Sequence, residues 1–318
     1  MKRISELMAR CVLPIVLMAL AATCVWAQAP ENSPPAAKAP DRGAVLVELF
    51  TSEGCPHCPE ADAMLEKLYT GQSVEGAQII ALEEHVDYWD RPAWVDHFSS
   101  PAFTERQKGY ADAMDLDSLY TPQMVVDGLV EFVGNNAPRA RATISALGRA
   151  PLAAVRILPV AAAADGKKPA GAAQVRLESR DLSLASPSEV YLALAEEKLF
   201  SRVGGGRNAG ESWPHSSIAR WLHLAGKLPA GSRSFSLIAE IAAPEAGWRL
   251  ENLRLIALVQ EEETRRILAL GSARLADVVP QPGAVPKAAA RSSNTPWIYN
   301  PLSAEVNCVA ATQAESLR

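Results

Sequence analysis

The sequence predicts an α/β domain with a mixed central sheet and helices on both of its faces, followed by a mostly β, sandwich-like C-terminal domain. Three observations support this prediction. From residue 43 to about residue 150, apolar runs of strand length alternate with segments of helical spacing. Cys55 and Cys58 stand where the first predicted strand passes into the first predicted helix. After residue 151, short strand-like runs follow one another with turn residues between them, which is typical of an all-β layer structure.

The first predicted strand is the apolar run Val45–Phe50, and a polar turn at residues 51–54 follows it. A helix is predicted over residues 56–69, because apolar side chains recur there at helical spacing. Two cysteines separated by two residues, at a point where a strand passes into a helix, are the layout of a thioredoxin-like redox site. This pair is the most specific feature of the sequence.

The following segments continue the alternation. They are a strand (78–86), a helix (101–114), a strand (123–126), a hairpin turn at Asp127-Gly128, a strand (129–133) and a closing helix (137–149). The order β-α-β-α-β-β-α is that of a thioredoxin-like layer structure, with helices on both faces of one sheet. We therefore predict a thioredoxin-like domain over residues 43–150.

A β-rich domain is predicted over residues 151–279. The segment 216–224 has strand-like content but also fits a helix by its apolar spacing. The segment Gly204–Gly210 lacks the Gly-Lys-Ser/Thr ending of a phosphate-binding loop, so it is interpreted as a flexible hairpin loop. His215 and His223 are isolated in the sequence and are interpreted as surface or packing residues.

The N-terminus has the composition of a signal peptide. Basic residues precede the apolar run Cys11–Trp26, which is shorter than the roughly 20 residues that a membrane span needs. We expect cleavage near Ala27, which makes the protein periplasmic or secreted, without a stable membrane span. An uncleaved anchor is the alternative. The predicted divisions outside the two domains are a signal peptide (1–27), a Pro/Ala-rich linker (28–42) and a Pro/Ala/Ser-rich tail (280–318).

Composition and charge limit the partners. With 48% hydrophobic and 21% charged residues, the 318-residue chain has the composition of a globular protein. Its net charge of −5 and its lack of a sustained basic stretch argue against nucleic acid as a partner. After export the remaining cysteines are Cys55, Cys58 and Cys308, and an oxidising compartment lets the close pair cycle between disulfide and dithiol. Cys308 can stay free, pair between molecules or reach the active site.

The segment Cys55-Pro56-His57-Cys58 has the residues that disulfide exchange requires. Cys55 is expected to be the exposed, attacking thiolate at the helix start, where free backbone N–H groups lower its pKa, and Cys58 resolves the mixed disulfide. Pro56 suits the first helical position, and His57 can lower the pKa of Cys55 further when protonated. A stabilised thiolate makes the disulfide a comparatively strong oxidant. The alternatives are a structural bridge or half of a zinc site, although no second Cys-x-x-Cys completes a zinc set.

Thr121 and Pro122 immediately precede the predicted strand 123–126. Thioredoxin-like proteins carry a cis-proline at this place, facing the cysteines, where the backbone of the preceding residue pairs with an extended substrate. We therefore predict a cis Thr121–Pro122 bond with a substrate-docking role. The alternative is an ordinary trans-proline that starts a strand.

His85 and Asp87 are candidates for a proton relay or a metal site. If the strand continues through both, their side chains lie on one face, and Asp87 could orient the imidazole or relay a proton. With Cys55 and Cys58, His85 could instead complete a copper site. The simpler interpretation is a strand end whose polar residues cap the next loop.

Five motifs carry a family resemblance. They are Glu-Leu-Phe-Thr-Ser-Glu-Gly-Cys-Pro-His-Cys-Pro-Glu-Ala-Asp (48–62), His-Val-Asp-Tyr-Trp-Asp (85–90), Ser-Pro-Ala-Phe (100–103), Tyr-Thr-Pro-Gln-Met-Val-Val-Asp-Gly (120–128) and Gly-Arg-Asn-Ala-Gly (206–210). Together they resemble a secreted, thioredoxin-like bacterial family of unknown function, over roughly residues 43–275. The resemblance implies export, a thioredoxin-like fold with a β-rich C-terminal part and two cysteines at the redox position. The chain departs from the family in Pro56-His57, the dipeptide of periplasmic disulfide-forming oxidants, and in Glu60; the dipeptide favours an oxidant.

The function predicted from the sequence is an exported thiol–disulfide oxidoreductase that acts on protein or small-molecule thiols and exchanges electrons with an envelope redox partner. No organic cofactor is expected beyond the Cys55–Cys58 disulfide. One rival is a copper-binding protein or metallochaperone that uses the same cysteines. The other is a non-catalytic envelope binding module on a thioredoxin-like fold.

Overall fold

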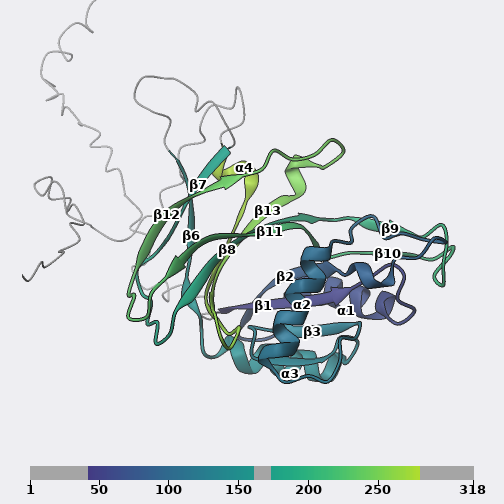
Figure 1. The fold of residues 1–318 in the computed structure, drawn as a ribbon, viewed down its shortest axis with the longest axis horizontal. Helices are drawn as coiled ribbons and strands as arrows, with labels where there is room; N and C mark the ends of the chain where they lie inside the picture. The colour runs from purple at the N-terminus through teal and green to yellow at the C-terminus, as the bar shows by residue number, and fades with distance from the viewer. Residues whose placement is uncertain (1–41, 161–172, 280–318) are drawn as a thin grey trace, which may run out of the picture.

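The computed structural model describes residues 42–160 and 173–279 (Figure 1). The predicted signal peptide, nearly all of the predicted linker, the predicted tail and Cys308 lie outside the described residues. No helix within the described ranges is long and apolar enough to cross a membrane.

The N-terminal part has the predicted order of strands and helices. β1 runs parallel to β2 and antiparallel to β3, and β3 and β4 form the predicted hairpin. The hairpin turns at Asp127 and Gly128, whose φ angles of 50° and 63° are better tolerated by Asp and Gly than by most residues. The elements are β1 (Gly43–Thr51), α1 (Cys58–Gly71), β2 (Ala77–His85), the 3₁₀ turn η1 (Asp87–Trp89), α2 (Pro101–Ala113), β3 (Gln123–Val126), β4 (Val130–Val133) and α3 (Ala137–Gly148).

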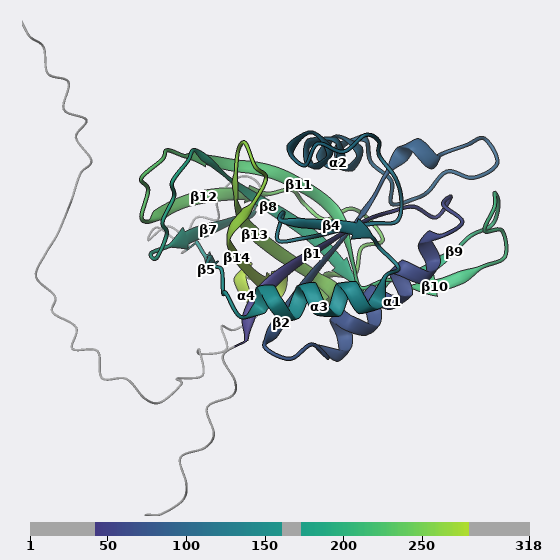
Figure 2. The same cartoon turned by 90° about the horizontal axis from the view of Figure 1, so that it is seen from below.

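β1 and β2 are buried on both faces, because their alternate side chains meet helices on opposite sides of the sheet. Val45, Val47 and Leu49 of β1 share a hydrophobic core with α1 and α3. Leu46 packs with Phe103 of α2 in a second core on the other face. Figure 2 shows α1 and α3 on one side of these strands and α2 on the other.

The C-terminal part is largely β. The helix alternative for residues 216–224 is wrong, because residues 217–224 belong to β11 and most of them pair with β8. The elements are β5 (Ala153–Ala154), β6 (Arg156–Pro159), β7 (Ala173–Ser179), β8 (Ser188–Glu197), β9 (Phe200–Arg202), β10 (Ser212–Pro214), β11 (Ser217–Leu228), β12 (Phe235–Ile241), the 3₁₀ turn η2 (Leu250–Asn252), β13 (Leu253–Glu261), β14 (Ile267–Arg274) and α4 (Leu275–Val278).

One nine-stranded sheet runs through both parts of the chain, in the order β4-β3-β1-β2-β11-β8-β13-β14-β5. The two parts meet where β11 pairs in parallel with β2, at Ile218 and Glu83. A three-stranded sheet, β12-β7-β6, packs on the C-terminal half of the large sheet, and Leu177 of β7 shares a core with Leu192 of β8 and Leu255 of β13. The C-terminal part is therefore not a self-contained sandwich, since its larger layer continues into the N-terminal part.

The start of α1 differs from the starts of the other two long helices. Ser100 caps α2 by accepting from the N–H of Ala102 at 3.3 Å, and Asn136 caps α3 by accepting from the N–H of Arg139 at 3.1 Å. His57, at the same position of α1, makes no side-chain capping hydrogen bond. The N–H groups in the first turn of α1 are therefore not taken by a capping side chain.

Candidate redox site

Cys55 and Cys58 are joined by a disulfide bond, with 5.4 Å between their Cα atoms, so the predicted pairing is confirmed. Cys58 is the first residue of α1, and Cys55 lies in the turn before it, where its N–H donates to the carbonyl oxygen of Ser52 at 3.1 Å. The prediction that Pro56 takes the first helical position is wrong. α1 begins two residues later, and Pro59 lies in its first turn, where a missing N–H costs no hydrogen bond.

The disulfide is buried, with both cysteines 0% exposed, so the prediction of an exposed attacking cysteine is wrong for this conformation. The loop between β9 and β10 covers the turn that carries Cys55. Asn208 of this loop donates through Nδ2 to the carbonyl oxygens of Glu53 and Cys55, both at 2.8 Å. The same loop approaches Trp94 closely, since a Cβ at Gly204 would lie 3.0 Å from the indole ring. The segment interpreted as a flexible hairpin loop is thus packed on the redox turn.

The Thr121–Pro122 peptide bond is cis, as predicted. The hydroxyl of Thr121 accepts a hydrogen bond from Nε1 of Trp89 at 2.7 Å. Trp89 lies against Gly54, because a Cβ at this glycine would be 3.1 Å from the carbonyl oxygen of Trp89. Trp89 therefore connects the Thr121–Pro122 bond to the turn that carries the cysteines. The substrate-docking role stays a prediction.

His85 ends β2 and is fully buried. Its Nδ1 lies 2.7 Å from Oδ2 of Asp96, which also accepts from the N–H of Glu53 at 2.8 Å. The predicted pairing of His85 with Asp87 is wrong. β2 ends at His85 and the chain turns into η1, so strand alternation does not extend to Asp87, whose carboxylate accepts from the hydroxyl of Thr104 at 2.5 Å.

His215 is not isolated, because it lies buried beside His85, with 5.2 Å between the ring centroids. Its Nδ1 is 2.7 Å from Oε2 of Glu83, and its Nε2 is 2.7 Å from the hydroxyl of Ser201. The pairing of β11 with β2 brings these residues together. We call Glu83, His85, Asp96, Ser201 and His215 the histidine cluster.

Glu53 connects the histidine cluster to the redox turn, and sequence reasoning missed it. Its Oε1 accepts from the hydroxyl of Ser201 at 2.5 Å, and its Oε2 accepts from Nε1 of Trp94 at 2.9 Å. Glu53 stands two residues before Cys55 in the sequence. That proximity was the signal that could have identified it.

Asp62, which sequence reasoning also missed, lies one helical turn after Cys58 and is fully buried. The hydroxyl of Thr51 donates to its Oδ1 at 2.7 Å, and Nε1 of Trp213 donates to its Oδ2 at 2.9 Å. Burial raises the pKa of Asp62 to about 7, against the lowering effect of the nearby His215 ring. A buried carboxyl that exchanges a proton near neutral pH therefore lies on the helix that Cys58 begins.

The pKa values of His85, Asp96 and Glu83 are shifted in the directions that favour their charged forms. Burial acts to lower the pKa of His85, but the Asp96 carboxylate more than offsets this and raises it. Burial likewise acts to raise the pKa of Asp96, and the His85 ring and hydrogen bonds hold it at about 2. Burial opposes charge on Glu83 too, yet His215 and Ser216 lower the pKa of Glu83 below its ordinary value.

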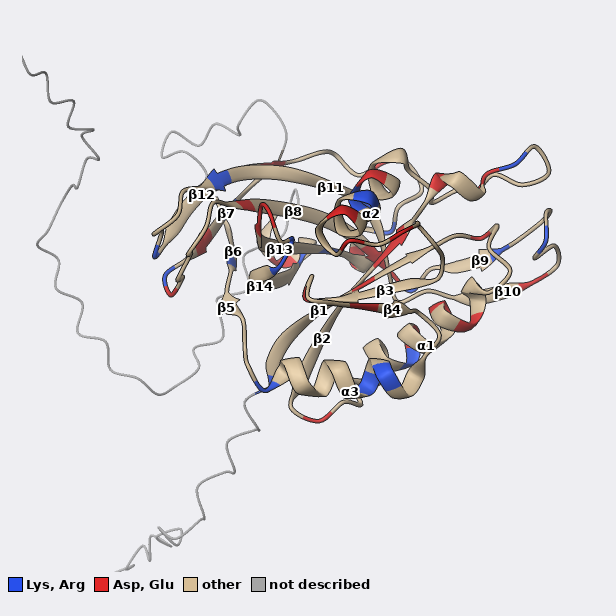
Figure 3. Cartoon of the chain, turned by 60° about the horizontal axis from the view of Figure 1, so that its bottom comes forward, with Lys and Arg blue, Asp and Glu red and all other residues tan. Residues whose placement is uncertain are grey.

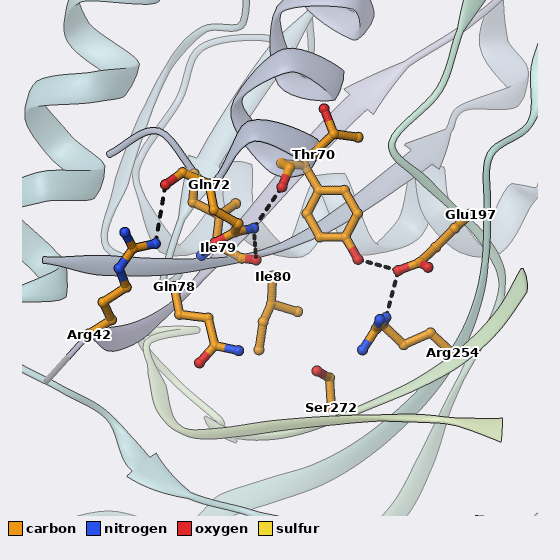
Figure 4. Close-up of a pocket in the computed structure, with 10 residues that line it drawn as sticks. Arg42, Thr70, Gln72, Gln78, Ile79, Ile80, Glu197, Arg254 and Ser272 are labelled. Atoms are coloured by element: carbon orange, nitrogen blue, oxygen red, sulfur yellow. Dashed lines mark hydrogen bonds and ion pairs between the residues drawn. The ribbon is translucent and has the colours of Figure 1, made fainter. Parts of the chain in front are cut away.

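A pocket of about 490 Å³, drawn in Figure 4, lies at the C-terminal end of α1. The disulfide lies at the opposite, N-terminal end of this helix. Its polar side chains bind one another. The Tyr69 hydroxyl donates to Glu197, Nε of Arg254 lies 2.6 Å from the same carboxylate, and Nε2 of Gln72 donates to the carbonyl oxygen of Ile79 at 3.0 Å. The Tyr69 and Arg254 contacts join α1 to β8 and β13, and the Gln72 contact joins the end of α1 to β2, which indicates a structural role.

Comparisons with known proteins agree with this architecture. Residues 46–260 match a family described as "Protein of unknown function (DUF1223)", and the match spans both the disulfide and the β-rich part. A thioredoxin from Methanocaldococcus jannaschii is 29% identical over 103 residues, which cover 32% of this chain and 92% of the thioredoxin.

Two solved structures share the fold. A protein from Agrobacterium tumefaciens aligns with a TM-score of 0.56 at 23% identity, over 74% of this chain and 95% of that chain. HBP35 of Porphyromonas gingivalis aligns with a TM-score of 0.53 at 14% identity, over 83% of this chain and 82% of that chain.

Proposed function

The chain belongs to the DUF1223 family, whose function is unknown, and we propose that it is an exported thiol–disulfide oxidoreductase acting on protein or small-molecule thiols. The observation that carries the proposal is the Cys55–Cys58 disulfide at the start of α1, in a chain with sequence similarity to a thioredoxin. A cysteine pair with this spacing at a helix start is typical of exchange catalysts.

In the proposed reaction, a substrate thiolate attacks Sγ of Cys55. A mixed disulfide forms between the substrate and Cys55, and Cys58 leaves with the electron pair of the broken S–S bond. A second substrate thiolate then attacks the substrate sulfur, which releases the substrate disulfide and the Cys55 thiolate. The substrate loses two electrons and the protein gains them, and an envelope redox partner reoxidises the protein.

The start of α1 supports Cys55 as the thiolate that attacks and leaves. The first-turn N–H groups carry partial positive charge, and His57 does not cap them with its side chain. His57 is exposed next to the pair, and when protonated it adds positive charge that favours a thiolate. We therefore assign the tuning of the Cys55 thiolate to the helix start, Pro56 and His57.

Asp62 is the proposed source of the proton that Cys58 needs when it leaves into a buried site. Residues four apart on a helix lie on the same face, and both side chains are fully buried. Thr51 and Trp213 hold the carboxyl in place. With a pKa of about 7, Asp62 is protonated in a large fraction of molecules at neutral pH.

The β9–β10 loop is the proposed gate to Cys55. A substrate reaches the buried sulfur only when the contacts of Asn208 with Glu53 and Cys55 open. Thr121 and Pro122, which Trp89 ties to the same turn, are the proposed docking segment for the substrate backbone. The β-rich part would thus control admission to the redox site.

Export is part of the same proposal. The basic and apolar composition of residues 1–27 is that of a signal peptide cleaved near Ala27. A disulfide of this kind can form and persist in the periplasm or outside the cell.

Oxidation of a reduced dithiol peptide by the purified protein tests the proposal. We expect one equivalent of peptide disulfide per chain, and none with Cys55→Ser. Equilibration with glutathione buffers should give a reduction potential above about −300 mV, and the Cys55 pKa should lie below about 8.5. A lower potential together with an ordinary thiol pKa would contradict an oxidant.

The two rival functions give different results. A copper-binding protein or metallochaperone using Cys55, Cys58 and His85 would form a tight stoichiometric Cu(I) complex when reduced, and His85→Ala would abolish it. A non-catalytic envelope binding module would function normally in a strain carrying Cys55→Ser. Either result would contradict the proposed exchange activity and support the corresponding rival function.

A further inference from the structure

Glu83, His85 and His215 bring three possible metal ligands together in the interior. Their ligand atoms lie within 4.8 Å of one another, and all three side chains are fully buried. Glu83 and His85 lie two residues apart on β2 and therefore share one face of the sheet, and His215 reaches them from the short link between β10 and β11. The three residues come from two distant segments that pair directly.

One buried atom of this group has no partner. Nδ1 of His85 binds Asp96, but Nε2 has no hydrogen-bond partner among the described residues and is shielded from solvent. A buried polar atom without a partner is costly, so such an atom in a native protein calls for a bound water or ion that satisfies it. The other ring nitrogens and carboxylate oxygens of Glu83, His85 and His215 all have partners.

Each of the three side chains also makes a hydrogen bond to a neighbouring residue that fixes its orientation. Asp96 binds Nδ1 of His85 at 2.7 Å, and Ser201 lies 2.7 Å from Nε2 of His215. Glu83 Oε1 accepts from the backbone N–H and the hydroxyl of Ser216, at 2.9 and 2.6 Å. Metal-binding histidines commonly use the second ring nitrogen in this way, with a carboxylate or another acceptor that fixes the ring.

The surroundings suit a cation. The hydrogen-bond partners of these three side chains within the described ranges are carboxylates, hydroxyls, imidazoles and backbone groups, with no Lys or Arg side chain among them. Two imidazoles and one carboxylate are ligands that Zn²⁺ and similar divalent transition ions accept.

We propose that Glu83, His85 and His215 bind one divalent transition-metal ion of the zinc class. Nε2 of His85, which has no partner among the described residues, binds the ion and releases the proton that it carries in the imidazolium form. The ion also replaces the hydrogen bond between Nδ1 of His215 and Oε2 of Glu83, with release of the proton that they share. Asp96, Ser201 and Ser216 are positioning residues. The site uses no cysteine, so it is distinct from a copper site at Cys55 and Cys58 and independent of the proposed exchange activity.

Zinc titration of the chelator-treated, fully oxidised full chain tests the site, because the disulfide then offers no thiolate. We expect one Zn²⁺ per chain by calorimetry and elemental analysis. His85→Gln and His215→Gln should lower the affinity at least about 100-fold, and Asp96→Asn about 10- to 100-fold. His223→Gln, which alters an exposed histidine of β11, is the matched control and should bind as the unmodified protein does.

X-ray absorption of the unmodified zinc-loaded protein keeps the proposal testable if a variant fails to fold. Scattering from two imidazoles, one carboxylate oxygen and no sulfur would support it. Absence of stoichiometric zinc, equal affinity in His85→Gln and the His223→Gln control, or a sulfur shell around the metal would each overturn it.

Discussion

Strand β2 carries buried polar clusters of different composition on its two faces. On the α2 face, Nε of Arg106 lies 2.7 Å from Oε1 of Glu48 and 3.2 Å from Oε1 of Glu84. Tyr110 and Gln260 lie 3.2 and 3.1 Å from the guanidinium nitrogens and complete what we call the arginine cluster. Burial raises the pKa of Glu84 well above its usual range, although Arg106 opposes this.

The histidine cluster lies on the α1 face of the same strand, at the alternate positions Glu83 and His85. Its side chains form hydrogen bonds with carboxylates, hydroxyls and each other. Figure 3 shows Asp and Glu on strands of the central sheet as well as on loops. Acidic side chains are therefore buried on both faces of β2. Their partner is a guanidinium on the α2 face and an imidazole on the α1 face.

The arginine cluster and the histidine cluster differ in whether their nitrogen-containing side chains can give up a proton. A guanidinium keeps its charge throughout the pH range in which proteins fold, so Arg106 remains a positively charged partner for Glu48 at every such pH. Imidazoles gain or lose a proton near neutral pH and bind metal ions. The α1 face also carries Asp62 and the disulfide, and it is the face to which we assign the proposed exchange of protons and electrons and the proposed metal ion.

Removal of the Arg106 guanidinium should have the largest effect on the free energy of unfolding. Arg106→Met leaves Glu48 buried without its cation, and we expect a loss of about 3–5 kcal/mol in the free energy of unfolding, measured with urea. Lys108→Met, which removes an exposed partner of Glu105 on the same helix, is the control and should leave the midpoint unchanged. A loss below about 1 kcal/mol for Arg106→Met would mean that the arginine cluster is not structural.

The α1 face should be sensitive to pH through Asp62. Burial raises its pKa from 3.8 to about 7, so the folded protein binds more protons than the unfolded chain between these values. The contribution of Asp62 to stability is full below about pH 4 and is lost as the pH rises through 7, a change of between about 1 and 4 kcal/mol. Asp62→Asn should remove this decline in urea unfolding at pH 4–8. An unchanged pH profile in that variant would show that another group titrates.

The contact between the β9–β10 loop and the redox turn should control access to Cys55. Asn208→Ala removes two hydrogen bonds, at a cost of about 1–2 kcal/mol. We expect dithiothreitol to reduce the disulfide several-fold faster in this variant. Arg207→Ala changes an exposed neighbour in the same loop and should leave the rate unaltered. Equal rates in both variants would argue against a gate.

The smallest effect is expected at the exposed His57, in contrast to the buried histidines. His57→Ala removes a positive charge that favours the Cys55 thiolate when the ring is protonated. Because solvent screens this charge, we expect the reduction potential to fall by no more than about 30 mV. A rise in potential, measured against glutathione, would mean that His57 does not stabilise the thiolate.

Local patterns predicted the N-terminal part well. The strand–helix alternation and the Asp127-Gly128 turn depend on neighbouring residues, and the structure has both in the predicted order. The joining of the two parts into one sheet depends on the pairing of Ile218 with Glu83, 135 positions apart in the sequence, which no local pattern reveals.

The candidate site likewise combines features that short motifs predict with features that depend on distant segments. The Cys55–Cys58 pair and the cis Thr121–Pro122 bond were predictable, since short motifs carry them. His215 and Asn208 reach the site from distant segments, and the latter lies 155 positions from Glu53. The predicted contact of Asp87 with His85 was wrong because strand alternation does not continue beyond the end of β2, where the chain turns into η1.

Trapping of mixed disulfides tests the central claim of exchange at Cys55 most directly. Cys58→Ser leaves Cys55 able to form a mixed disulfide that Cys58 can no longer resolve, whereas Cys55→Ser removes the attacking sulfur. After reaction with the disulfide-linked dimer of a single-cysteine peptide, whose adduct carries no second thiol, we predict that peptide mass spectrometry finds the adduct on Cys55 in the reduced Cys58→Ser protein and finds no adduct at Cys58 in Cys55→Ser. Adducts absent from both variants, or found on Cys58 as readily as on Cys55, would contradict the proposed exchange.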